Sequence, residues 1–215
     1  MELPLASSLK FPPPGSIPPP TSDLHTTVLL VGSVSTGKRT LARSILRTIK
    51  DRRFEFRTTG ALPLPHNITA RVDYVVLLVN QTDYSSLEAF RVSMLHLPAE
   101  YFLGRCAVVL THVDQAQRWA FELNVLYNSV VDICPTLPTF LVNLTSPQEA
   151  HVVAQHLATA FDTACGRTHD MTPLASQIIS LDCTDSIEEC WQESLSDLSG
   201  HLEDDVDMRA VDGHS

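Results

Sequence analysis

The clearest chemical signature in this sequence is a loop that begins and ends with glycine, Gly32-Ser-Val-Ser-Thr-Gly37, and is followed by Lys38. The spacing of Gly32, Gly37 and Lys38 is that of a Walker A phosphate-binding loop. In such loops the backbone N–H groups surround the phosphates and the lysine reaches the outer phosphate groups. These three residues therefore predict a nucleotide-binding position.

The residue after this lysine departs from the pattern. Walker A loops place Ser or Thr there, because its hydroxyl binds Mg²⁺. Here the position holds Arg39, and Thr40 lies about 100° further around a helix, so it points elsewhere. Two interpretations of the loop stay open: a loop that still binds a nucleotide, and a strand–helix turn that has kept its glycines. For catalysis, the second interpretation is favoured.

A second motif, Thr111-His112-Val113-Asp114, stands where GTPases place Asn-Lys-x-Asp to bind guanine. Asp114 keeps its place in that motif, whereas the Asn and Lys positions hold Thr and His. Asp114 is therefore a weak sign of guanine binding. The favoured alternative is that this carboxylate caps a helix starting at Gln115.

The switch region of a GTPase is missing from the expected place. Only about 20 residues separate Lys50 from the next buried strand, and they contain no Asp-x-x-Gly motif to sense the γ-phosphate. They do contain Leu62-Pro-Leu-Pro65, which cannot lie in the middle of a sheet. We therefore expect no enzyme, no catalytic residue, no metal site and no cofactor, with weak guanine-nucleotide binding left open.

The elements around these motifs alternate between strand and helix. The strands are expected at Thr26–Val31, Val72–Val79, Cys106–Leu110 and Thr139–Leu144, and the helices over 37–49, 85–96, 115–133 and from Ser146 onward. Such alternation is typical of parallel sheets. The pattern predicts a small-GTPase-like α/β fold: a doubly wound, mostly parallel sheet with helices on both faces and a shortened switch region.

Composition divides the chain into three parts. Residues 1–24 are rich in proline and are expected to be a disordered arm, residues 25–181 form the domain, and residues 182–215 are expected to be a largely disordered acidic tail. Apolar residues at helical spacing (Ile187, Trp191, Leu195 and Leu198) predict a short helix in that tail. Of 25 acidic and 15 basic residues, 11 acidic and one basic lie after residue 180. No apolar run is long enough to span a membrane, and five scattered cysteines favour the cytosol or nucleus.

The order and spacing of four segments resemble the centromere protein M family of GTPase-like kinetochore subunits. The segments are Leu62–Pro65, Arg71–Asn80, Tyr84–Leu87 and Tyr101–Gly104. The similarity runs with gaps from about Thr26 to Leu181 and is firmest over residues 61–110.

This resemblance implies a non-catalytic subunit of the inner kinetochore, located in the nucleus at centromeres, that stabilises a complex with centromere proteins I, H and K. It also implies loss of the phosphate-loop lysine and of the guanine-loop aspartate, yet this chain keeps Gly37, Lys38 and Asp114. The alternative function is a degenerate phosphate-loop switch with little or no GTP hydrolysis. No sequence-specific contact with nucleic acid and no contact with a membrane are expected.

The first helix carries a basic stripe formed by Arg39, Arg43, Arg47 and Lys50, which Arg52, Arg53 and Arg57 extend. An ordinary solvated helix face is one interpretation. Because the rest of the domain is nearly neutral, we predict instead that Arg43, Arg47, Lys50 and Arg53 bind a protein partner. The stripe lacks the aromatic residues and the fold signature of a nucleic-acid surface.

Overall fold

The computed structural model describes residues 9–10, 25–64 and 70–167. Short 3-10 helices are labelled η. In chain order the elements are β1 (Leu9–Lys10), β2 (Thr26–Val31), α1 (Lys38–Thr48), β3 (Phe54–Thr59), β4 (Ala70–Arg71), β5 (Tyr74–Asn80), α2 (Tyr84–His96), η1 (Ala99–Phe102), β6 (Cys106–Thr111), η2 (Ala116–Arg118), α3 (Leu123–Val131), β7 (Thr139–Val142) and α4 (Pro147–Ala164).

The centre of the fold is a five-stranded sheet in the order β3-β2-β5-β6-β7, and all four strand pairs are parallel. Strands β2, β5 and β6 are buried along their whole length, which explains their continuous apolar sequences. A separate short pair joins β1 to β4. This arrangement confirms the predicted small-GTPase-like α/β fold.

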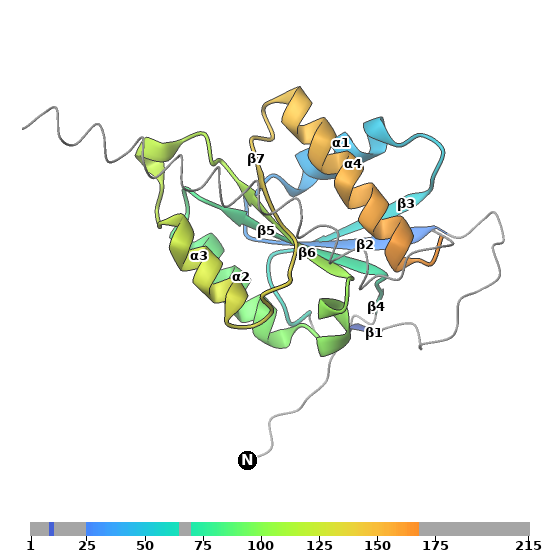
Figure 1. The fold of residues 1–215 in the computed structure, drawn as a ribbon, viewed down its shortest axis with the longest axis horizontal. Coiled ribbons are helices and arrows are strands. Elements are labelled where there is room, and N and C mark those ends of the chain that lie inside the picture. The colour runs from blue at the N-terminus through green and yellow to red at the C-terminus, as the bar shows by residue number, and fades with distance from the viewer. Residues whose placement is uncertain (1–8, 11–24, 65–69, 168–215) are drawn as a thin grey trace, which may run out of the picture. The chain divides into compact units, whose positions relative to one another are not determined.

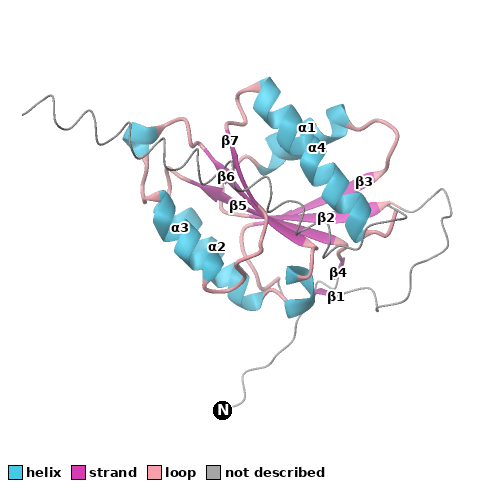
Figure 2. Ribbon diagram, in the orientation of Figure 1, coloured by secondary structure: helices cyan, strands magenta, loops and turns pink. Residues whose placement is uncertain are grey.

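Helices cover both faces of this sheet, as Figures 1 and 2 show. Alternate residues of β2 point to opposite sides, so Val28 and Leu30 pack with α1 and α4, whereas Leu29 and Val31 pack with α2 and α3. The core therefore has two apolar layers, one on each face of the sheet. The predicted doubly wound arrangement is confirmed.

Strand β3 corrects one expectation from the sequence. No strand was predicted between Lys50 and Val72, yet Phe54–Thr59 pairs with β2 in a register of six residues. Leu62-Pro-Leu-Pro65 begins only after β3 has ended, so it has no bearing on that strand. Because β3 is an edge strand, its residues are only partly buried and lack the apolar run of the central strands.

The predicted helix over residues 115–133 is also wrong in its first half. Only the turn η2 forms near its start, and α3 begins at Leu123. Between them, the Ala120 N–H donates to the Gln81 carbonyl at 2.9 Å, and the Gln81 side-chain amide donates to the Phe121 carbonyl at 2.6 Å. Gln81 directly follows β5, so these bonds fix residues 120 and 121 to the end of that strand, and no helix forms there.

Two of the predicted helix starts differ in outcome. Helix α2 is capped by Asp83, whose carboxylate accepts from the Ser85 N–H at 3.0 Å, so the predicted start at Ser85 is late. Helix α4 begins as predicted, with Ser146 as the cap and Pro147 in the first turn.

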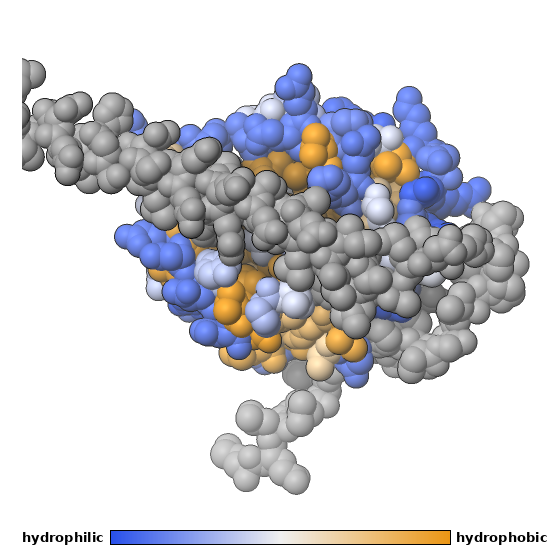
Figure 3. All heavy atoms as spheres, viewed as in Figure 1, coloured by the Kyte–Doolittle hydropathy of each residue, from blue (hydrophilic) through white to orange (hydrophobic). Residues whose placement is uncertain are grey.

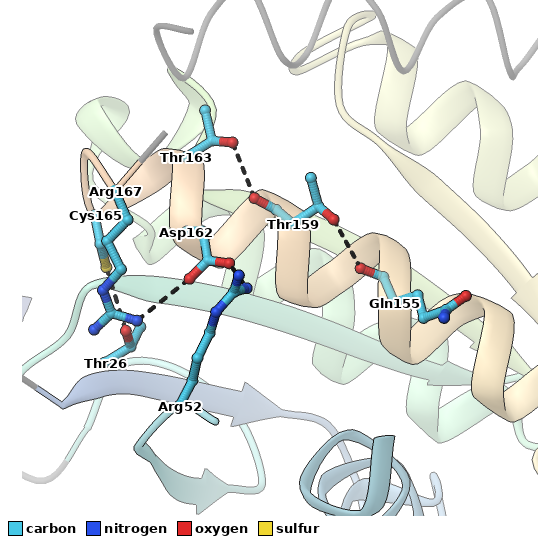
Figure 4. Close-up of polar contacts among 8 residues, drawn as sticks. All are labelled: Thr26, Arg52, Gln155, Thr159, Asp162, Thr163, Cys165 and Arg167. Atoms are coloured by element: carbon cyan, nitrogen blue, oxygen red, sulfur yellow. Dashed lines mark hydrogen bonds and ion pairs between the residues drawn. The ribbon is translucent and has the colours of Figure 1, made fainter. Parts of the chain in front are cut away.

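A buried carboxylate ties the end of α4 to the connection between α1 and β3. Asp162 is almost fully buried, and its carboxylate pairs with Arg52 and, at 3.3 Å, with Arg167 (Figure 4). Beside it, the Thr26 hydroxyl and the Cys165 thiol lie 3.5 Å apart. Charged and polar contacts thus join the C-terminal end of α4 to the start of β2 and to the α1–β3 connection.

Apart from β1, the predictions for residues 1–24 and 182–215, including the tail helix with Trp191, lie outside the described residues. Within the described ranges, no helix has the length and apolar character needed to cross a membrane.

Candidate functional site

The predicted phosphate loop connects β2 to α1, where a phosphate loop must lie. Gly37 has a φ of 81°, which favours glycine, and a Cβ there would overlap the Leu144 side chain. A Cβ on Gly32 would come within 2.5 Å of the Leu78 carbonyl oxygen. The backbone conformation therefore requires glycine at position 37, and close packing against backbone requires it at position 32.

The Lys38 ammonium is directed back onto the loop itself. It donates to the backbone carbonyl of Gly32 and, at 2.5 Å, to that of Ser33. Burial lowers the pKa of Lys38 from its usual value, and the neighbouring Arg39 charge lowers that pKa further. The charge that would meet the outer phosphates in a working loop is thus in contact with two carbonyl oxygens of its own chain.

A buried threonine at the end of β6 fixes the position of this loop. The Thr111 hydroxyl lies 3.4 Å from the Thr36 carbonyl and 3.2 Å from the Val79 carbonyl, so it links the loop to β5. His112 follows with a φ of 62°, and its Nδ1 lies 3.1 Å from the Thr111 hydroxyl oxygen. Thr111, which occupies the position of the guanine-motif asparagine, therefore has a structural role.

Asp114 does not share a pocket with the phosphate loop. It is exposed, and the shallow pocket beside it is lined by Asp114 and the next four residues, Gln115 to Arg118. The turn η2 takes Gln115 as its cap, so the predicted capping role of Asp114 is also wrong. The structure thus brings Gly32, Gly37 and Lys38 together and leaves Asp114 outside their loop.

The end of β3 lies where a GTPase would place its γ-phosphate sensor. The Gly32 N–H donates to the Thr59 carbonyl at 3.2 Å, so this end is adjacent to the phosphate loop. The residues there, Thr58-Thr59-Gly60-Ala61, contain no carboxylate that could hold Mg²⁺. Among the described residues, no group of three or more His, Cys, Asp and Glu side chains could bind a metal ion.

The basic stripe on α1 faces away from the core. Leu41 and Ile45 are buried on the opposite side, while Arg39, Arg43, Arg47 and Lys50 are exposed. The residues that extend the stripe differ, because Arg52 pairs with Asp162 and Arg57 pairs with Glu55 at 2.8 Å. The exposed arginines of α1 are the part of the stripe whose charge is not matched by a described acidic residue.

Sequence reasoning missed two residues that shape this end of the domain. Leu144 packs against Gly37, and buried Gln81 holds the chain before α3. The only sequence feature that pointed to Gln81 was its place directly after an apolar strand. No sequence feature pointed to Leu144.

A model of the centromere protein M family matches residues 19–181 of this sequence. The match covers most of the chain and all of the described sheet. The chain belongs to the centromere protein M family. This result confirms the resemblance predicted from the sequence.

Individual members of the family are modestly similar. The chain is 26% identical to centromere protein M of Bos taurus over 151 residues, which cover 69% of this chain and 82% of the bovine protein. It is 31% identical to centromere protein M of Xenopus laevis over 99 residues, 45% of this chain and 55% of the frog protein. The human centromere protein M is 31% identical over 86 residues, 40% of this chain and 48% of that protein.

The segments that resemble the centromere protein M family contribute to the core. The Leu62 N–H donates to the buried Ser93 hydroxyl oxygen at 3.0 Å, and the Tyr101 hydroxyl donates to the Val72 carbonyl at 3.0 Å. Both Leu62 and Tyr101 are buried. These segments therefore contribute to the packing of β5, α2 and η1.

Proposed function

We propose that this chain is a non-catalytic structural subunit of the inner kinetochore that stabilises a complex with centromere proteins I, H and K. Its family membership supports a role as a centromere protein in the nucleus. The specific partners follow from the family resemblance noted in the sequence.

The non-catalytic part of this proposal rests on what occupies the lysine and metal-ligand positions of the phosphate loop. The Lys38 ammonium contacts the Gly32 and Ser33 carbonyls, and Arg39 takes the place of the hydroxyl that would bind Mg²⁺. No carboxylate follows β3 to complete a metal site. Phosphoryl transfer depends on positioned charge and metal, so a loop with these changes has little means to catalyse it.

A second candidate function is a degenerate switch that binds a guanine nucleotide without hydrolysing it effectively. It is favoured by the loop geometry, because Gly32, Gly37 and Lys38 retain their places between β2 and α1. Against it stand Arg39 at the position of the Mg²⁺ ligand, and Thr111 and His112 at the Asn and Lys positions of the guanine motif. We therefore rank it second.

Reconstitution with centromere proteins I, H and K tests the proposal. The full chain is expected to co-purify with them and to raise the thermal stability of the complex. Lys38→Ala should leave assembly unchanged, whereas a nucleotide switch would lose partner binding in the same variant. Failure of the unaltered chain to join or stabilise the complex would contradict the proposed role.

A further inference from the structure

A groove lies between α1 and the first turns of α4. Its lining combines apolar residues of the β7–α4 connection and α4 with positive and hydroxyl-bearing side chains, of which the argument uses Thr40, Arg43, Arg47, Thr48, Thr145 and His151. The lining includes no acidic residue. On the side of the molecule that carries α1 and α4, the surface seen in Figure 3 is mostly hydrophilic.

The two arginines of this groove differ from others in the domain. Arg52, Arg57, Arg91 and Arg167 each pair with a carboxylate of the chain. The side chains of Arg43 and Arg47 are exposed and form no ion pair with any described residue. They are four residues apart on α1, so their guanidinium groups lie on one face, one helical turn apart.

The walls of the groove are already fixed to each other. The Ser44 hydroxyl of α1 donates to the Ala150 carbonyl of α4 at 3.0 Å. One turn later, the Thr48 hydroxyl oxygen lies 3.0 Å from Nδ1 of His151. Below these contacts, Leu41 and Ile45 of α1 pack in the same apolar layer as Val153 and Leu157 of α4. A ligand therefore meets a preformed surface and pays little to order it.

We infer that this groove docks an extended acidic segment of a partner protein, whose carboxylates bind Arg43 and Arg47. This inference rests on the proposed function, because it assumes a protein partner. Carboxylates fit guanidinium groups through paired hydrogen bonds, and the Thr40 hydroxyl can donate a further bond to the segment. The groove offers no Phe, Tyr or Trp on which nucleic-acid bases could stack, so a protein segment is favoured.

Fluorescence polarisation with a labelled oligoglutamate peptide and the full chain tests the inference. The peptide is expected to bind at low salt, and binding should weaken as salt rises. Arg47→Gln should lower the affinity about tenfold, because it removes a charge-assisted contact. Arg118→Gln is the matched control: it removes the same charge from an exposed site on η2 and should leave the affinity nearly unchanged.

Three outcomes would overturn the inference. Equal loss of affinity in Arg47→Gln and Arg118→Gln would show general charge attraction rather than a site. Absence of peptide binding by a folded chain would exclude an acidic occupant. Tighter binding of a short DNA duplex, lost in Arg47→Gln, would make the groove a nucleic-acid site. Assembly with centromere proteins I, H and K, measured in parallel, separates failure of this groove from failure of the proposed function.

Discussion

The Lys38 ammonium donates a hydrogen bond to the Ser33 backbone carbonyl at 2.5 Å, within the loop that carries both residues. A phosphate-loop lysine acts by directing its charge to the outer phosphates. Here the same charge binds the loop that should surround the ligand. Gly37 is required by its backbone conformation and Gly32 by close packing, so the fold alone accounts for both glycines.

Replacing Gly37 by alanine should destabilise the domain by about 2–4 kcal/mol. The substitution places a side chain at a φ of 81° and forces its Cβ into Leu144. Urea denaturation measures the loss as a lower midpoint.

Gly60→Ala is the matched control for this experiment, because a Cβ at Gly60 meets nothing within 4 Å. Its effect should stay within about 0.5 kcal/mol. Equal losses of stability in the two variants would show that neither the backbone conformation of Gly37 nor its contact with Leu144 requires glycine there.

Asp162→Asn should cost about 2–4 kcal/mol of unfolding free energy. The substitution removes a buried negative charge that pairs with Arg52 and Arg167. Urea denaturation at low ionic strength measures the effect without screening the pair.

Glu88→Gln serves as the control for Asp162, because it breaks an exposed pair with Arg91 on α2. Such pairs contribute about 0–1 kcal/mol, so little change is expected. A loss for Asp162→Asn no larger than that control would argue against the buried tie between α4 and the α1–β3 connection.

Cys106 should be the slowest of the described thiols to react with iodoacetamide in the folded protein. It is fully buried in β6, and burial raises the pKa of its thiol far above the usual value, so the reactive thiolate is scarce. Cys134 is only partly buried and should react sooner. Peptide mass spectrometry after timed alkylation gives the order, and early modification of Cys106 in folded protein would contradict the described core.

The sequence predicted the central strands because each is a continuous apolar run buried on both faces. It did not predict β3, because an edge strand is half exposed and Phe54-Glu55-Phe56-Arg57 alternates apolar and charged residues. The two prolines after Leu62 do not bear on residues 54–59. They exclude a central strand at their own positions only, and β3 ends before them.

The sequence predicted which residues belong to the candidate site, but not how their side chains are arranged. Spacing identified Gly32, Gly37 and Lys38, and the missing Mg²⁺ ligand was evident from Arg39. Spacing could not show that Lys38 binds its own loop, or that Gln81 prevents a helix from starting at Gln115. Those outcomes depend on contacts between residues far apart in sequence or on a side-chain direction, which local propensity does not specify.

Calorimetric titration of the purified full chain with GTP, GDP and ATP, with and without Mg²⁺, tests the central claim most directly. A folded chain should give no binding heat with any of the three nucleotides, because Arg39 replaces the Mg²⁺ ligand and the residues that follow β3 directly, Gly60 and Ala61, include no carboxylate to hold the metal. Guanine-specific binding that is lost in both Lys38→Ala and Asp114→Ala would contradict the account and establish a nucleotide-responsive member of the centromere protein M family.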